Sequence, residues 1–270
     1  MVVRTALLLL CMLTALPAWA AGYLERLSDI DIRRVHAEEE PNVVFSQLQF
    51  DGAVIGSIKQ TIENPYSEGN YLLTIDQTFP LFKDMRINNQ VRKIIAEEIA
   101  SFADERIDSY CKGTDSNHDR DWVLHGRYLL FSSGKNCVTV FLTMNKNYCL
   151  MNSPDKFIPV VFSTKTGKRL GLKDMFRNPD KARKLMEQYV EGEVRNILAE
   201  EKTAFEPNDQ KQIKRTMKDF TRFFPTKDGL VLIFYRFEIL QGAHSDTFLP
   251  IPLEKLMPAG PSKEVWDTVK

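Results

Sequence analysis

The stretch GLVLIFYRFEILQGAHSDTFLPIP, residues 229–252, decides the fold class of this chain. Its first half is the most apolar of the strand-like runs and predicts a strand over residues 229–240. A polar segment with a glycine follows, and a second apolar run then carries Pro250 and Pro252. Because proline cannot donate a ladder hydrogen bond, we expect the second run to form an edge strand. Residues 240–247 are therefore predicted to form a loop at the rim of an antiparallel sheet.

Outside this stretch, the hydrophobic pattern changes between strand and helix periods. Apolar residues recur at three- and four-residue steps over residues 86–110 and 178–202, which predicts two long amphipathic helices, and a shorter one is predicted over residues 208–220. The order strands, helix, strands, helix, strands is typical of α+β proteins with antiparallel sheets, on which we expect the two long helices to pack. Further strands are predicted over residues 42–50, 53–65, 70–82, 122–133 and 136–148, and from residue 156 onward.

The first twenty residues, MVVRTALLLLCMLTALPAWA, have the layout of a secretory signal peptide. Arg4 precedes an apolar stretch, and the small residues Ala18 and Ala20 frame a cleavage site that we predict after Ala20. No later segment approaches ~18 uninterrupted apolar residues, so no further membrane span is predicted. We expect a periplasmic or secreted protein in which residues 21–41 form a polar lead-in.

Charge and composition argue against two classes of protein. Removal of the signal peptide takes away one arginine and no acid, which leaves 35 of the 36 basic residues against 36 acidic residues. A nucleic-acid-binding protein normally needs a basic surface, which this balance does not indicate. With 43% apolar residues the chain can form a core, so it is not expected to be disordered.

Three cysteines remain after signal cleavage: Cys111, Cys137 and Cys149. In an oxidising compartment, three cysteines predict one disulfide and one free thiol. Cys137 and Cys149 flank a strand-like run whose ends would lie too far apart for a bridge, so we expect Cys111 to pair with one of them. Without clustered histidines, the three thiols do not predict a zinc site.

The four histidines are the first candidates for chemistry. His36 lies in the charged lead-in, His118 lies in an Asp- and Asn-rich loop that fits no known cation site, and His125 alternates along a strand as half-buried residues do. His244 and Asp246 are of the types that form a base and its orienting carboxylate, but no nucleophile motif accompanies them. We therefore predict no catalytic residue, no metal site and no cofactor. His244 and Asp246 are expected to make surface contacts or to stabilise the turn.

Three segments together resemble one known family, which comprises the extracytoplasmic domain of RsiV-type anti-sigma factors and the non-catalytic module of PdaC-type deacetylases. The shared pattern is an extended strand, a proline and an Asn-rich helix start, then a strand with a Thr-Gly-Lys turn, and finally an apolar strand, a Gly-containing loop and Ile-Pro. The resemblance covers roughly residues 43–257. The segments are YLLTIDQTFPLF (71–82) with INNQVRKIIAEEI (87–99), FSTKTGKRLGLKDMF (162–176), and DGLVLIFYRFEILQGAHSDTFLPIPLEKL (228–256).

One element of the family pattern is missing from this chain. The Gly-Gly-Ala-His-like element expected ahead of the Thr-Gly-Lys turn is replaced by NYCLMNSPDKF at residues 147–157, whereas a Gly-Ala-His occurs at residues 242–244. From the order of the segments we interpret residues 42–135 as an N-terminal α/β half, residues 136–260 as a C-terminal RsiV-like half, and residues 261–270 as a tail.

The resemblance implies an α+β fold and a role in recognising a protein or a glycan. RsiV-type members bind lysozyme, so the resemblance implies an exported, non-catalytic module that recognises or inhibits a lysozyme-like cell-wall hydrolase. Two other hypotheses stay open: a cell-envelope module that binds peptidoglycan glycan without catalysis, and a cryptic hydrolase that uses His244 and Asp246. We expect binding through exposed loops at residues 111–121, 148–156 and 240–247. The candidate binding residues are His118, Tyr148, Met151, Asn152, Gln241, His244 and Asp246.

Overall fold

The structure is a computed structural model, and it describes residues 33–35, 54–63, 72–104, 122–148, 151–152, 154–240 and 246–269. The chain forms two compact units. Unit 1 takes its described residues from 33–128 and 143–156, and unit 2 takes its residues from 129–142 and 157–269. The expected boundary after residue 135 falls in the short turn between two strands, and each unit contains residues from both sides of it.

Unit 1 is built on a sheet with the strand order β1-β2-β3-β4-β5, and the short strand β6 also pairs with β5. The β2–β3 pair is antiparallel, as predicted, but β3 and β4 are parallel. β1 also pairs antiparallel with β2, which corrects the expectation that residues 21–41 are only a polar lead-in. A parallel pair needs a long crossover connection, which the helix α3 (Met85–Asp104) supplies between β3 and β4. The strands are β1 (Arg33–Val35), β2 (Val54–Glu63), β3 (Leu72–Leu81), β4 (Trp122–Gly134), β5 (Cys137–Tyr148) and β6 (Met151–Asn152).

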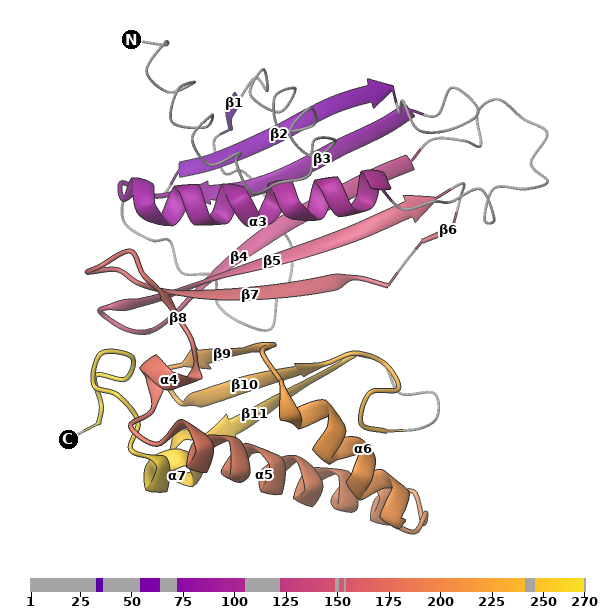
Figure 1. The fold of residues 1–270 in the computed structure, drawn as a ribbon, viewed down its shortest axis with the longest axis vertical. Helices are drawn as coiled ribbons and strands as arrows, with labels where there is room; N and C mark the ends of the chain where they lie inside the picture. Colours follow the sequence, from indigo (N-terminus) through magenta and orange to yellow (C-terminus); the bar gives the residue numbers. More distant parts are fainter. Residues whose placement is uncertain are drawn as a thin grey trace. The chain divides into compact units, whose positions relative to one another are not determined.

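Helix α3 lies along one face of this sheet (Figure 1). Its start is fixed by two side chains, because Asp84 Oδ1 accepts a hydrogen bond from the Arg86 N–H at 2.9 Å and Asn88 exchanges hydrogen bonds of 2.7 and 2.8 Å with the backbone of Phe82. The apolar residues whose spacing predicted the helix are its buried face, except for Ile94, which is half-buried. The buried apolar residues of α3 are Ile87, Val91, Ile95, Ile99 and Phe102.

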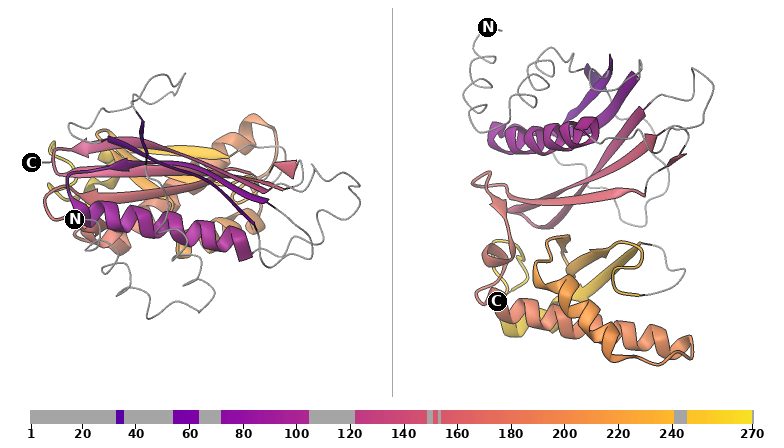
Figure 2. Two further views of the ribbon diagram at one scale, coloured as in Figure 1. Left: turned by 90° about the horizontal axis from the view of Figure 1, so that it is seen from above. Right: turned by 45° about the vertical axis from the view of Figure 1, so that its right-hand side comes forward.

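Unit 2 contains the part of the eight-stranded sheet with the order β4-β5-β7-β8, a second, antiparallel sheet with the order β11-β10-β9, and helices. Helices α5 and α6 cover one face of the second sheet (Figures 1 and 2). The elements are β7 (Lys156–Ser163), β8 (Arg169–Leu170), α4 (Leu172–Met175), α5 (Pro179–Glu200), α6 (Pro207–Lys218), β9 (Phe223–Thr226), β10 (Gly229–Phe234), β11 (Thr247–Pro252), α7 (Leu253–Leu256) and the 3₁₀ helix η2 (Met257–Ala259).

The core of unit 2 surrounds β10, whose six residues are all buried. Helix α5 was expected to bury Leu185, Tyr189, Val194, Ile197 and Leu198, but only the valine and Leu198 are buried and the other three are half-buried at the edge of the core. The stripe is rotated slightly, since the remaining buried positions of α5 are Ala182, Met186 and Val190. The mixed sheets and packed helices confirm the α+β fold class.

Residues 261–269, which we expected to form a tail, belong to the core of unit 2. Val265 and Trp266 are fully buried, and the Trp266 indole N–H donates a hydrogen bond of 2.9 Å to the carbonyl oxygen of Thr226. The Trp266 ring also packs on Phe176, with 5.3 Å between ring centroids. Long-range contacts that the polar local sequence does not reveal therefore hold this segment.

Cys137 is a free and fully buried thiol, so the predicted Cys111–Cys137 alternative for the disulfide is wrong. Burial raises the pKa of the Cys137 thiol from 9.0 to about 11. Cys111 and Cys149 lie outside the described residues. None of the described helices combines the length and the apolar character of a membrane-spanning segment.

Candidate functional site

The connection that follows β10 begins earlier in the chain than the sequence predicts. The apolar run predicts a strand through Leu240, but β10 ends at Phe234 and residues 235–240 form a turn. Phe237 has a φ of 67°, in the left-handed region that a bulky side chain rarely adopts. A residue in this conformation cannot continue a strand, so the chain leaves the sheet here.

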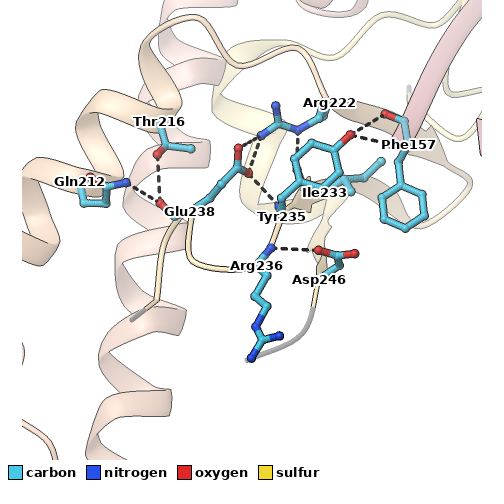
Figure 3. Close-up of polar contacts among 9 residues, drawn as sticks. All are labelled: Phe157, Gln212, Thr216, Arg222, Ile233, Tyr235, Arg236, Glu238 and Asp246. Atoms are coloured by element: carbon cyan, nitrogen blue, oxygen red, sulfur yellow. Dashed lines mark hydrogen bonds and ion pairs between the residues drawn. The ribbon is translucent and has the colours of Figure 1, made fainter. Parts of the chain in front are cut away.

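An ion pair fixes the turn from the inside (Figure 3). Arg222 Nη2 donates to both carboxylate oxygens of Glu238, at 2.6 and 2.5 Å, and the Tyr235 N–H donates to Glu238 Oε2 at 2.8 Å. The side chains of Arg222 and Glu238 are each 27% exposed, so water screens the pair only partly. Charge-assisted hydrogen bonds in such a position are stronger than neutral ones. Glu238 therefore ties the turn to the segment that leads into β9.

Helix α6 holds the backbone of the same glutamate. Gln212 Nε2 and Thr216 Oγ1 donate hydrogen bonds of 3.0 and 3.1 Å to the carbonyl oxygen of Glu238 (Figure 3). These two residues lie one helical turn apart, so they point from the same face of α6. Both the side chain and the backbone of Glu238 are thus held by other elements of unit 2.

Tyr235 anchors the first residue of the turn. Its ring lies under the Arg222 guanidinium, 4.6 Å from the ring centroid, in cation–π geometry. Its hydroxyl accepts a hydrogen bond of 3.0 Å from the Phe157 N–H, and the rings of Tyr235 and Phe157 stack with centroids 6.0 Å apart. The turn is therefore joined to β7 as well as to α6.

Asp246 closes the connection on its far side. Its Oδ1 accepts a hydrogen bond of 2.9 Å from the Arg236 N–H, which joins the residue before β11 to the turn after β10 (Figure 3). This contact makes Asp246 a turn-stabilising group. Gln241 and His244, the other candidates from this loop, lie outside the described residues.

The arrangement presents Phe237 to solvent. Its side chain is 55% exposed, and the guanidinium carbon of Arg236 lies 4.7 Å from its ring centroid. Phe237 was not among the predicted binding residues, because Tyr235, Phe237 and Ile239 alternate as residues of a strand do. An exposed aromatic ring on a fixed turn is a typical anchor for a binding partner. We call Arg236 and Phe237 the turn surface.

The remaining candidate residues belong to other places. Tyr148 and Met151 are paired in register between β5 and β6, and Asn152 is the last residue of β6, so these three candidates from the predicted 148–156 loop belong to paired strands of unit 1. His118 lies outside the described residues. His125 was expected to be half-buried, but it is exposed on β4, with its Nδ1 3.6 Å from Asp76 Oδ2.

The described side chains offer little for metal chemistry. No group of three or more His, Cys, Asp or Glu residues in the described part of the chain could hold a metal ion. Asp76 also forms an ion pair with Arg127 at 3.2 Å, so the contacts of His125 belong to an exposed charge cluster on the sheet. This cluster contains no nucleophile.

Comparison with known proteins identifies the fold. No family model matches this chain, and no curated protein matches it. A crystal structure of a DUF3298 family protein from Pseudomonas aeruginosa PAO1 is similar, with 15% sequence identity and a TM-score of 0.50 over 78% of this chain and 95% of that chain. A member of the same family from Bacteroides fragilis has 12% identity and a TM-score of 0.44, covering 77% of this chain and 93% of its own. The first of these two structures shows that the chain has a fold similar to that of a DUF3298 family protein, a domain of unknown function.

Proposed function

We propose that this protein is an exported, non-catalytic binding module that recognises a protein partner through the turn surface, Arg236 and Phe237. The observation that carries the proposal is the exposed Phe237 ring at a positive φ on a turn held from three sides. A left-handed conformation costs a non-glycine residue about 1–2 kcal/mol. Phe237 keeps this strained conformation although its ring is exposed and adds little to the stability of the core.

The chemistry of the turn surface suits a protein interface. Aromatic residues and arginine are enriched among the residues that dominate binding energies, and Arg236 and Phe237 supply one of each. The hydrogen bonds of Glu238 and Asp246 hold the backbone in place before a partner arrives, which lowers the entropy cost of binding. Loops on a rigid scaffold are the usual position for recognition.

Two features of the sequence support the choice of partner in this proposal. The signal-like residues 1–20 support a partner outside the cytoplasm. The resemblance to RsiV-type domains, whose members bind lysozyme, supports a lysozyme-like muramidase as the first partner to test. In this proposal, the protein recognises or inhibits such a hydrolase in the periplasm or after secretion.

The test combines binding with inhibition. Hen lysozyme is mixed with the purified protein, and complex formation is followed by co-elution in gel filtration and by the rate of cell-wall lysis. The variant Phe237→Ser removes the exposed ring, and Met257→Ala is the matched control, since Met257 is also exposed in unit 2, at 48%. We expect co-elution and slower lysis with the native protein and the control, and neither with Phe237→Ser.

Different failures would reject different parts of the proposal. Without co-elution or inhibition, lysozyme is not the partner. Capture of one periplasmic protein by the native chain, but not by Phe237→Ser, would then retain the binding role with another partner. If instead the native protein sediments with insoluble peptidoglycan, the glycan-binding hypothesis replaces the protein-binding one. If Phe237→Ser behaves as the native protein in every assay, the turn surface is not the binding site.

A further inference from the structure

A second feature of unit 2 is independent of the turn surface. Unit 2 has a hollow of about 400 Å³. Helix α4 and the two residues that follow it form one wall, and the turn at residues 262–264 forms the other. We call it the α4 hollow. Its volume lies within the range of small-molecule sites in proteins.

Three cationic side chains line the α4 hollow: Lys173, Arg177 and Lys263. All three residues are exposed, and their side chains have no hydrogen bond or ion pair within the described residues. They come from two segments that are about ninety positions apart in the sequence. Unpaired cations brought together by the fold create a positive potential that attracts anions.

The two carboxylates in the lining are already engaged by neighbours. Asp174 Oδ1 accepts from Lys168 Nζ at 2.5 Å and its Oδ2 accepts from the Gly171 N–H at 2.9 Å. Glu264 Oε1 accepts from the Ser163 hydroxyl at 2.7 Å. With Lys168 included, four cations face two carboxylates, so the α4 hollow has an excess of positive charge.

The lowered pKa of Asp174 is consistent with its contacts to Lys168 and Gly171. Burial alone would raise that pKa, but the hydrogen bonds from Gly171 and Lys168 and the nearby charges of Lys168 and Lys173 outweigh burial and hold the pKa below its usual value. Asp174 is therefore ionised at neutral pH and paired with Lys168, and although Lys173 also feels its charge, the cations still outnumber the carboxylates.

The two walls of the α4 hollow are held together by backbone contacts. The Arg177 N–H donates to the Gly260 carbonyl oxygen at 2.9 Å, the Ser262 N–H donates to the Met175 carbonyl oxygen at 2.8 Å, and Phe176 forms a β-bridge with Pro261. The hollow thus exists before any ligand binds, which lowers the cost of binding.

Gly260 also positions the arginine. Its φ of 68° is left-handed, and a Cβ at this position would lie 3.3 Å from the Cβ and Cδ of Arg177. The absence of a side chain lets the aliphatic part of Arg177 lie against the Gly260 backbone. Ser262 completes the lining, since its Oγ accepts from the Glu264 N–H at 3.2 Å and its hydroxyl hydrogen remains able to donate to a ligand.

We propose that the α4 hollow binds a small ligand with two or more oxyanion groups, either phosphates or carboxylates. The planar guanidinium of Arg177 can hold one oxyanion with two parallel hydrogen bonds, and Lys173 and Lys263 act as point charges for a second group. The Ser262 hydroxyl adds a neutral donor. This site does not depend on the turn surface, and it stands if the proposed protein partner is rejected.

The test is calorimetric titration of the full chain at low ionic strength with two probes, inorganic pyrophosphate and citrate. Sodium chloride at matched ionic strength serves as the blank. We expect saturable binding of at least one probe, and the tighter probe identifies the preferred oxyanion as phosphate or carboxylate. Affinity should fall as sodium chloride is added, because salt screens exposed charges.

Charge-removing variants locate the site. Arg177→Gln and Lys263→Gln should each weaken binding of the tighter probe by tenfold or more, whereas the control Arg215→Gln, an exposed arginine on α6, should change it by less than twofold. Lys263 lies on an exposed turn, so its variant remains informative if Arg177→Gln does not fold. Absence of saturable binding of both probes up to about 10 mM overturns the proposal, since a pre-formed site should bind more tightly than this. Equal loss of affinity in all three variants also overturns it.

Discussion

Replacement of Phe237 by glycine and by alanine tests the backbone conformation on which the proposed function depends. Both changes remove the ring and its contact with Arg236, so both lose the same side-chain interactions. The two variants differ only in the backbone freedom of residue 237. Their difference in stability therefore measures the cost of the positive φ separately from every contact of the ring.

The expected difference follows from the observed φ of 67°. Alanine in a left-handed conformation is strained by about 1–2 kcal/mol, whereas glycine adopts it without strain. Glycine loses about 0.5–1 kcal/mol more than alanine in backbone entropy on folding. From the middles of these two ranges, Phe237→Gly should thus be more stable than Phe237→Ala by roughly 0.75 kcal/mol. At a position with ordinary negative φ, the sign would be reversed.

The measurement uses urea unfolding followed by tryptophan fluorescence. Of the three tryptophans, Trp19 lies in the predicted signal peptide, so changing Trp122 to phenylalanine leaves Trp266, which is buried in unit 2, as the reporter of the mature chain. With a slope of about 2 kcal/mol per molar urea, the two midpoints should differ by roughly 0.4 M. A midpoint of Phe237→Ala equal to or above that of Phe237→Gly would show that residue 237 is not left-handed. The case for a pre-organised turn surface would then fail.

Three further predictions concern other parts of unit 2. Glu238→Gln should lower the free energy of unfolding by about 1–2 kcal/mol in the same urea assay, because Arg222 loses its charged acceptor; an unchanged midpoint would mean that the ion pair does not hold the turn. Cys137 should make the free energy of unfolding depend on pH. Below pH 9 the folded and unfolded states both keep the thiol proton, and between pH 9 and about 11 only the unfolded state loses it. Over that window the native protein should therefore lose about 2–3 kcal/mol more stability than Cys137→Ala does. Equal loss in both proteins would contradict the burial of the thiol. Trp266→Ala should cost about 3–5 kcal/mol, measured by circular dichroism on heating, and a cost below about 1 kcal/mol would show that the last segment is a tail after all.

The sequence predicts the fold best where buried apolar residues recur at a regular spacing along the chain. In α3, Ile87, Val91, Ile95 and Ile99 recur at helical steps because one face packs on the sheet, so the pattern and the packing have the same cause. The parallel pairing of β3 with β4 was not predictable in this way. Period-two patterns indicate which residues face the core, but they carry no information on strand direction.

The end of β10 shows why the turn surface could not be predicted. Tyr235, Phe237 and Ile239 continue the strand pattern, and nothing in the local sequence favours a left-handed phenylalanine. The contacts that stop the strand come from elsewhere, because Arg222 lies 16 positions before Glu238. A local propensity for strand is thus overridden by a tertiary ion pair, as propensities commonly are.

The α4 hollow also depends on contacts between residues that are far apart in the sequence. Lys173 and Arg177 are unremarkable surface residues in the sequence, and Lys263 lies in the segment that we expected to be a tail. They become neighbours because Trp266 and Val265 bury that segment, and its backbone then bonds to Met175. Burial of an aromatic residue near the end of the chain therefore creates a charged site several residues away. In both candidate sites, long-range packing places residues whose chemistry is ordinary until the fold brings them together.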